Sequence, residues 1–384
     1  MPKNILFVVD NLVMGGITKV LVNLLQNLDE EKYCVDLLVL HYYEDMSIKI
    51  PKSVNIIKGN EYFSYVDVSI KKILKDKDLK EFFKKLSLVM SLKSGKIEKK
   101  IKSARKNLLK KEYDTEIAFS DGFAHIFVAN GDTPNKIAWM HTDISVRNDS
   151  KRYYGLVKKS LEKMNMSVCV SDRVREVYKE YYDIPDAKIQ TIHNIINIEV
   201  RRDTGSKKLD IEYSKDVINL ISVGRLETQK NYTRFIKVHK KLIDDGYKIN
   251  SYLIGDGLEY EKLSNLVKEE KIENTFKMLG RKDNPFPYVK NADLFVLSSI
   301  LEGLPTVLYE SVILGTPCVS TLVAGAREVL KDEYGLVVEN SDEGLYNGLK
   351  RILDDENLLR KYKSNALMYK SENDDIINKI EKIL

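Results

Sequence analysis

Cysteine is scarce in this sequence: the 384 residues include only Cys34, Cys169 and Cys318. Each falls within an apolar run, so we expect small core residues in a reducing compartment and not a disulfide framework. No pair of Cys or His residues has the spacing of a metal site. The composition therefore predicts neither disulfides nor a bound metal.

Long hydrophobic runs are also missing. No apolar stretch reaches the roughly 18–20 residues that a membrane-spanning helix needs, and the first residues lead into a predicted strand without a signal-peptide pattern. The net charge is only +5, and no helix-turn-helix, zinc-finger or RNP-like aromatic pattern occurs, so we expect no nucleic-acid partner. These absences predict a cytoplasmic protein.

A chain of 384 residues with 43% hydrophobic and 31% charged residues predicts two globular domains, each with its own core. Short apolar runs alternate with stretches of helical periodicity, which is typical of doubly wound parallel α/β sheets. The polar, aperiodic region 197–216 is interpreted as a linker. The sequence thus predicts two Rossmann-like domains, 1–196 and 217–373. The expected strands of the first domain cover residues 4–9, 33–40, 54–57, 116–120, 136–141, 166–171 and 188–193.

Two glutamates border a predicted strand-to-helix loop in the second domain. The apolar run 294–297 predicts a buried strand, and Glu302 follows it in a turn that Gly303 allows to bend sharply. Glu310 lies in the next predicted helix. The backbone N–H groups near Gly303 and Leu304 suit an anionic or hydroxyl-rich ligand. On spacing alone, ordinary solvated helix-entry charges remain an equal alternative.

A pair of cations follows the first strand of the second domain. Arg225 follows the apolar run 219–223 after one glycine, and Lys230 precedes a predicted helix. Arginine binds phosphate through its bidentate fork and lysine as a point charge, so the pair is suited to a diphosphate. The alternative is an exposed pair that makes surface contacts.

These motifs resemble those of retaining glycosyltransferases of the family-4 type, which have the GT-B fold. Glu302 and Glu310 are separated by GLPTVLY, which is similar to the family's paired-glutamate signature, and the Val-Gly-Arg-Leu-x-x-x-Lys-Asn segment is similar to its phosphate-binding loop. The resemblance implies two Rossmann-like domains facing a central cleft. It also implies that Glu310 holds ribose hydroxyls, that Glu302 holds the donor sugar, and that Arg225 and Lys230 stabilise the leaving diphosphate without a metal.

Three glycine-containing loops match the family's pattern by position. Gly15 and Gly16 correspond to the loop over the donor diphosphate and sugar, although a simple tight turn explains them equally well. Gly255 and Gly257 fall in a Gly-Asp-Gly turn that lies near the nucleotide in the family. Arg281 follows the next strand and would face the base. The resemblance implies substrate-binding roles for all five.

Two polar residues follow strands of the first domain. His141 ends the run 136–141, where the resemblance implies a histidine beside the donor sugar, and a structural histidine is the alternative. Asp121 occupies a similar strand end. It could orient an acceptor hydroxyl, but a helix cap for the next helix is the interpretation that we favour slightly.

The resemblance implies transfer of a hexose or N-acetylhexosamine from a nucleotide sugar, with UDP-sugar favoured, to a hydroxyl acceptor. A lipid-linked or cell-surface glycan precursor is the implied acceptor. A nucleotide-sugar epimerase of the same fold is an alternative, because it would isomerise the donor alone. A non-catalytic partner subunit is another, although the motif residues that it would be expected to lose are present.

The region 61–112 concentrates positive charge. It holds 16 Lys and Arg against 7 Asp and Glu, a net +9, so the rest of the chain is net acidic. Apolar residues recur there at helical spacing, which fits a helix at an anionic membrane surface, peripheral to the inner face of the cell membrane. The alternative is that the apolar face packs on the sheet and the lysines are merely solvated. The closing segment 374–384 is expected to pack back on the first domain, as is common in GT-B proteins.

Overall fold

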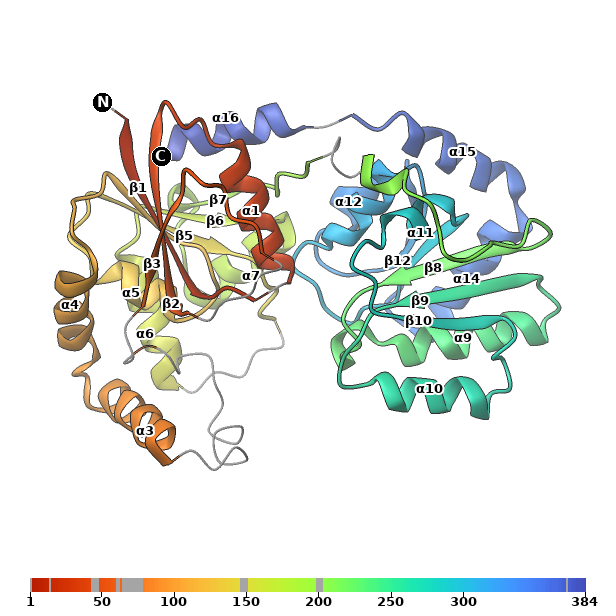
Figure 1. The fold of residues 1–384 in the computed structure, drawn as a ribbon, viewed down its shortest axis with the longest axis horizontal. Helices are drawn as coiled ribbons and strands as arrows, with labels where there is room; N and C mark the ends of the chain where they lie inside the picture. Colours follow the sequence, from red (N-terminus) through yellow and green to blue (C-terminus); the bar gives the residue numbers. More distant parts are fainter. Residues whose placement is uncertain are drawn as a thin grey trace. The chain divides into compact units, whose positions relative to one another are not determined.

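The computed structural model describes residues 2–13, 15–42, 48–59, 63, 79–145, 151–197, 203–370 and 372–384. Internal contacts divide the chain into two compact units (Figure 1). The first comprises Met1–Ile195 and Asn373–Leu384, and the second comprises Ile196–Glu372. Part of the predicted linker lies outside the described residues, so the domain limits 1–196 and 217–373 stay a prediction.

The first unit is built on a parallel sheet. Within its described residues, seven strands lie in the order β3-β2-β1-β4-β5-β6-β7, and every neighbouring pair is parallel. The strands begin and end within two or three residues of the apolar runs that predicted them. Their bounds are β1 Lys3–Asn11, β2 Tyr33–His41, β3 Asn55–Lys58, β4 Thr115–Ala118, β5 Asn135–Met140, β6 Met166–Cys169 and β7 Ile189–Thr191.

Helices lie between most of these strands along the chain, because parallel neighbours need crossover connections. Most of these helices bury one apolar face within the unit. They are α1 Gly16–Asn27, α3 Leu79–Ser94, α4 Ile97–Leu108, α5 Phe123–Ala129, α6 Lys151–Glu162, α7 Asp172–Tyr182 and the C-terminal α16 Asn373–Ile383.

The second unit repeats this architecture. In its described part, six parallel strands lie in the order β10-β9-β8-β11-β12-β13. They are β8 Ile218–Val223, β9 Ile249–Ile254, β10 Phe276–Gly280, β11 Leu294–Leu297, β12 Cys318–Thr321 and β13 Gly335–Val338. The helices are α9 Tyr232–Asp244, α10 Tyr260–Glu269, α11 Phe286–Asn291, α12 Thr306–Ile313, α13 Ala326–Leu330, α14 Asp342–Asp354 and α15 Glu356–Leu367.

Continuous apolar strands form the core of each unit. Leu6, Phe7 and Phe119 are fully buried in the first, and Phe235 and Phe276 are buried in the second. Parallel strands are covered on both faces, which explains why they were recognisable as unbroken apolar runs and not as alternating patterns. The predicted fold class, two doubly wound parallel sheets, is confirmed.

Each sheet changes its winding direction once. In the first sheet the change falls between β1 and β4, and in the second it falls between β8 and β11. At such a switch point the loops leave the carboxyl ends of neighbouring strands toward opposite faces, which opens a crevice where α/β proteins bind ligands. The loops after β8 and β11 are therefore the first place to look for a site.

The C-terminal helix α16 packs within the first unit. Ile376, Ile380 and Leu384, spaced by four residues, are buried. Thr115 donates a hydrogen bond of 2.9 Å to the carbonyl oxygen of Leu384, and Asn135 donates one of 2.7 Å to that of Ile383. The last turn of α16 is thus tied to the beginnings of β4 and β5.

One sequence-based expectation about the core is wrong. Cys169 and Cys318 are buried, but Cys34 is exposed. It is the second residue of β2, where the strand enters the sheet, and its sulfur lies 3.5 Å from Lys111 Nζ. A strand's first residues can extend beyond the helices that cover its centre, so position in an apolar run did not ensure burial.

Candidate functional site

The loops after β8 and β11 meet at the switch point of the second sheet. Lys230, at the end of a 3-10 turn formed by residues 228–230, places its Nζ 2.6 Å from Glu302 Oε1. Ser299 donates a 2.7 Å hydrogen bond to the same oxygen. The ammonium and the carboxylate are 72 residues apart in sequence and form one partly buried polar group at the carboxyl edge of the sheet.

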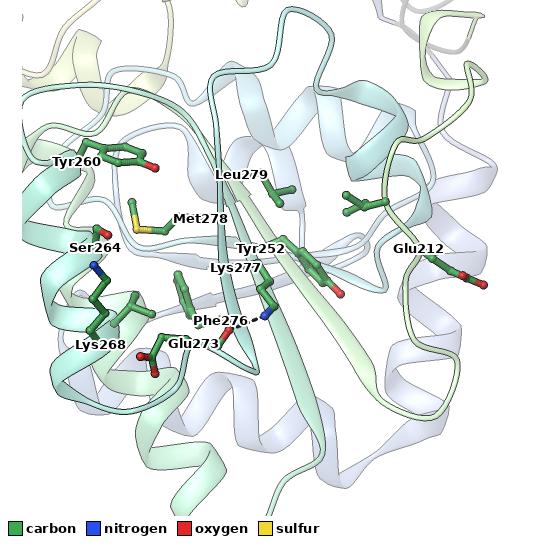
Figure 2. Close-up of a pocket in the computed structure, with 12 residues that line it drawn as sticks. Glu212, Tyr252, Tyr260, Ser264, Lys268, Glu273, Phe276, Lys277, Met278 and Leu279 are labelled. Carbon is green, nitrogen blue, oxygen red and sulfur yellow. Dashed lines mark hydrogen bonds between the residues drawn. The ribbon is translucent and has the colours of Figure 1, made fainter.

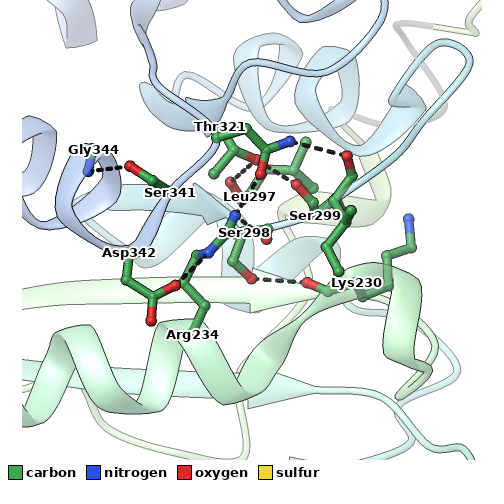
Figure 3. A network of polar contacts seen from close by, with 11 residues as sticks. Lys230, Arg234, Leu297, Ser298, Ser299, Thr321, Ser341, Asp342 and Gly344 are labelled. Carbon is green, nitrogen blue, oxygen red and sulfur yellow. Dashed lines mark hydrogen bonds and ion pairs between the residues drawn. The ribbon is translucent and has the colours of Figure 1, made fainter.

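Local sequence explains how Lys230 is presented there. Asn231, the residue before α9, adopts a left-handed conformation with φ 49°, so the chain turns sharply after Lys230. Asparagine tolerates this conformation better than most residues. The carbonyl oxygen of Lys230 accepts a 2.9 Å hydrogen bond from Ser298 Oγ, which ties the turn to the end of β11 (Figure 3).

The two predicted phosphate-binding cations lie in different environments. The side chain of Lys230 is 20% exposed and that of Glu302 is 11% exposed, so their mutual attraction is poorly screened by water. Arg225 is 67% exposed, and its Nη1 lies 3.1 Å from Glu227 Oε1. The structure therefore brings Lys230 to Glu302, whereas Arg225 stands at the surface with a neighbouring carboxylate.

The Gly-Asp-Gly turn after β9 packs directly on the loop after β8. At Gly255 the backbone has φ +155°, and a Cβ there would lie 1.9 Å from the carbonyl oxygen of Gly224. Leu226 N donates to the Asp256 carbonyl at 2.9 Å, and a Cβ on Gly257 would meet the Leu226 backbone. Close packing of the two loops thus supplies a structural reason for both glycines, and their substrate-binding role stays a prediction.

The other predicted site residues at this edge of the sheet differ in solvent exposure. Arg281 follows β10, is 69% exposed and lies 3.9 Å from Asp283. Glu310, on α12, is buried with 6% of its surface exposed, and Leu304 is buried as well. Gly303 and Leu304 pack against Gly325, where φ is +73° and a Cβ would lie 2.4 Å from Leu304 Cδ1.

In the first unit, Gly15 caps the N-terminus of α1 and Gly16 begins it. A Cβ on Gly16 would meet no atom of the described structure within 4 Å, and one on Gly15 would meet only a carbonyl oxygen at 3.8 Å. Neither glycine is required by packing among these residues. The absence of side chains leaves the start of α1 open to a ligand.

Asp121 and His141 lie together at the carboxyl ends of β4 and β5. His141 N donates to both carboxylate oxygens of Asp121, at 3.1 and 2.9 Å, and Tyr178 donates its hydroxyl to Asp121 Oδ1 at 3.1 Å. The expectation that Asp121 caps the next helix is wrong. Asp10, from the end of β1, accepts the first N–H groups of α5, from Phe123 at 2.9 Å and Ala124 at 2.7 Å.

His141 is held as a neutral ring. Burial lowers its pKa to about 3, against the opposing effect of a hydrogen bond with the Phe119 backbone. Its Nε2 is buried and has no hydrogen-bond partner among the described residues. The ring donates its one N–H to the Phe119 backbone, so the unpaired Nε2 of the neutral imidazole can accept a hydrogen bond from a hydroxyl.

A pocket lies elsewhere in the second unit, beside the edge strand β10 and helix α10 (Figure 2). Its lining includes Tyr252, Tyr260, Phe276 and Met278 together with Lys268. It contains none of the predicted site residues. Over the described ranges, no group of three or more His, Cys, Asp or Glu side chains is arranged to hold a metal ion.

Sequence reasoning missed Asp10, Ser299 and Gln229. Asp10 lies at the carboxyl end of β1, just after the apolar run 4–9, and Gln229 and Ser299 lie in the loops that follow β8 and β11. The strand-end rule that singled out His141 would have found Asp10. Ser299 had no such signal, because its contact with Glu302 depends on the curl of the loop.

Residues 206–368 match the family model described as "Glycosyl transferases group 1". Residues 206–368, which make up most of the second unit, are thus similar to the group 1 glycosyltransferases. The match covers Arg225, Lys230, Glu302 and Glu310, and the two parallel sheets form the GT-B fold.

Curated relatives resemble this chain over part of their length. The N-acetylgalactosamine-N,N'-diacetylbacillosaminyl-diphospho-undecaprenol 4-alpha-N-acetylgalactosaminyltransferase of Campylobacter jejuni is 32% identical over 188 residues, 48% of this chain and 50% of the relative. The UDP-Gal:alpha-D-GlcNAc-diphosphoundecaprenol alpha-1,3-galactosyltransferase of Escherichia coli is 27% identical over 230 residues, 56% and 58% of the two chains. The chain spans about half the length of the curated relatives it matches.

Solved structures resemble it over nearly the whole length. Anabaena HepE in complex with UDP has a TM-score of 0.71 at 15% identity, over 99% of this chain and 98% of that one. WaaG, a glycosyltransferase of lipopolysaccharide biosynthesis, has a TM-score of 0.65 at 13% identity, over 99% of each chain. At these identities the likeness shows the fold.

Proposed function

We propose that this protein is a retaining glycosyltransferase that moves a hexose or N-acetylhexosamine from a UDP-sugar to a hydroxyl acceptor. The observation that carries the proposal is the contact of Lys230 with Glu302 at the switch point of the second sheet. It supplies a cation for a diphosphate and a carboxylate for sugar hydroxyls side by side. The family match and the UDP bound in HepE favour UDP as the nucleotide.

The proposed roles follow from charge and position. Lys230 and Arg225 would bind the diphosphate and stabilise the charge that develops on it as the glycosidic bond breaks. Glu302 would bind the donor sugar and Glu310 the ribose. His141 would accept a hydrogen bond from a sugar hydroxyl through its Nε2, which is buried and has no partner among the described residues. The open glycine positions at the start of α1 would admit the donor, and no metal is required if the cations neutralise the diphosphate.

The acceptor is proposed from the names of the relatives. The Campylobacter jejuni and Escherichia coli enzymes act on diphospho-undecaprenol-linked sugars. We infer a lipid-linked or cell-surface glycan precursor for this chain. That acceptor would place the protein in the cytoplasm at the inner face of the cell membrane, where such lipids are accessible.

A panel of UDP-, GDP- and ADP-sugars tests the donor class by thermal shift. A ligand present at 100 times its dissociation constant adds about 2.7 kcal/mol of stability, which raises the melting temperature measurably. We expect UDP-sugars alone to do so. Product analysis with the bound donor and a lipid-linked acceptor then separates transfer from epimerisation: isomerised donor without transfer would contradict the proposal.

Helix α3 supports attachment to an anionic membrane surface. Phe83, Leu86 and Met90 recur on one face of α3 with 64%, 36% and 60% of their surface exposed. In contrast, Ile97 and Ile101 of α4 are fully buried, so the packing alternative holds for that helix. Residues 64–78 of the basic region 61–112 lie outside the described residues. Within the described residues, no helix is long and apolar enough to cross a membrane.

Liposome co-sedimentation tests this attachment. Each lysine near an anionic surface contributes about 1 kcal/mol, and apolar side chains add to it. We expect wild type to sediment with anionic vesicles at low salt and less at high salt, and Phe83→Ser/Met90→Ser to remain in the supernatant. Leu367→Ser, which changes another exposed apolar residue in the second unit, is the control. Wild type remaining in the supernatant at low salt would exclude the membrane surface.

A further inference from the structure

The loop that carries Glu302 is held through its main-chain carbonyl groups. Four consecutive residues, 298–301, each have a carbonyl oxygen that accepts a hydrogen bond from a side chain of a different segment. Figure 3 draws two of the donors, Arg234 and Thr321, with Ser298 and Ser299. The donors are Arg234 Nη1 to Ser298 at 3.3 Å, Thr321 Oγ1 to Ser299 at 2.7 Å, Asn340 Nδ2 to Ile300 at 2.9 Å and Gln229 Nε2 to Leu301 at 2.6 Å. We call these four side chains the carbonyl clamp.

Arg234 is the part of the clamp that organises the others. It lies in the first turn of α9 and is buried, with 8% of its surface exposed. Its Nε donates to Asp342 Oδ1 at 2.9 Å, and its Nη1 donates to Asn340 Oδ1 at 2.7 Å. Because the guanidinium only donates, it fixes the Asn340 amide with its oxygen toward Arg234 and its nitrogen toward Ile300.

The clamp also sets the distance between the two loops of the site. Ile300 N donates to the Gln229 carbonyl at 2.8 Å, and Ser298 Oγ donates to the Lys230 carbonyl at 2.9 Å. The chain from Ser298 to Leu301 is therefore bonded on both sides, and the next residue is Glu302. A shift of this segment would move the Glu302 carboxylate away from Lys230 Nζ and Ser299 Oγ.

We propose that Arg234 is a positioning residue that, through Asn340 and the 298–301 carbonyls, holds Glu302 in register with Lys230. The inference rests on the proposed function, since it assigns Arg234 an effect on the transfer step. A buried arginine is costly unless its donors are satisfied. Here the guanidinium is directed at the loop of the site and at the residue that holds that loop.

Arg234→Gln is the test variant, because glutamine keeps part of the length and polarity but loses the charged fork. We expect kcat to fall about 10- to 100-fold, as misplacement of a reacting group by about 1 Å can cause. The donor KM should stay within about threefold. Arg234→Lys should be intermediate, because one ammonium cannot bridge Asp342 and Asn340 as the fork does. Arg360→Gln removes an exposed arginine paired with Glu356 on α15 and should leave kcat unchanged.

A double-mutant comparison separates positioning from general destabilisation. If Arg234 acts through Glu302, Arg234→Gln should lower kcat much less in a Glu302→Gln background than in wild type. Equal fold-losses in both backgrounds would overturn the proposal. The proposal would also be overturned if Arg360→Gln lowered kcat as much as Arg234→Gln does.

Amide hydrogen exchange gives a readout that needs no activity. Peptides covering 298–304 should exchange about 10-fold faster in Arg234→Gln, and those covering α15 should not change. Unaltered exchange in 298–304 would overturn the clamp. If wild type turned over no nucleotide sugar, the proposed function would fail, and the exchange measurement would still decide whether Arg234 holds the loop.

Discussion

Replacing Lys230 by alanine is the most direct perturbation of the proposed site. The substitution removes the ammonium that lies 2.6 Å from Glu302 Oε1 and leaves that oxygen with Ser299 Oγ as its described partner. It also removes the cation that would face the leaving diphosphate. Both effects act at the same carboxyl edge of the sheet, so the variant tests the charge arrangement of the site directly.

The size of the effect follows from the burial of the pair. With one fifth of the Lys230 side chain exposed, an effective dielectric constant of about 20 is appropriate, and a unit charge about 4 Å away then contributes about 4 kcal/mol. If about half a charge moves to the diphosphate in the transition state, the loss is about 2 kcal/mol, or roughly 30-fold in kcat. Misalignment of Glu302 would raise the loss to about 100-fold, the range seen when one oxyanion donor is removed.

The assay is steady-state transfer from the UDP-sugar that the thermal-shift panel selects, with kcat and KM measured separately. Lys240→Ala is the matched control, because Lys240 lies on α9 and pairs with Asp244 at the surface. We expect its kcat to equal that of wild type. A Lys230→Ala variant that melts like wild type and keeps its kcat within twofold would refute the diphosphate role.

Four further outcomes are expected. Calorimetry should show that Glu310→Gln weakens UDP and UDP-sugar alike, whereas Glu302→Gln weakens only UDP-sugar; equal losses for Glu302→Gln would contradict the assigned roles. Transfer should survive EDTA, and a loss reversed by Mg²⁺ or Mn²⁺ would show that the cations of the site do not suffice. Burial lowers the pKa of His239 to about 4, so the ring takes up its proton mainly on unfolding; between pH 6.5 and 4 this residue should lower the free energy of unfolding by at most about 1.4 kcal/mol for each unit that the pH falls, and the decline should be less steep in His239→Asn. Deleting residues 373–384 should lower the free energy of unfolding, measured in urea, by about 3 kcal/mol or more, because the buried side chains of Ile376, Ile380 and Leu384 are lost.

The sequence by itself determined the elements and the fold class. Parallel strands covered on both faces appear as continuous apolar runs, so β1, β5 and β11 could be located within a few residues. Residues at strand ends were likewise visible, because the carboxyl edge of a parallel sheet is where a polar residue follows an apolar run. His141 is such a residue, whereas Lys230 and Glu302 lie farther along the loops and stood out through the spacing of their motifs.

The tertiary structure alone decided which of these residues touch. Strand order places β8 beside β11, and only that order brings Lys230 to Glu302 across 72 residues of sequence. Likewise, Asp10 and not Asp121 caps α5, since β1 lies beside β4 and the Asp10 carboxylate reaches across. Periodicity records which face of an element is buried, but contacts between loops depend on how the chain winds, and that information is spread over the whole chain.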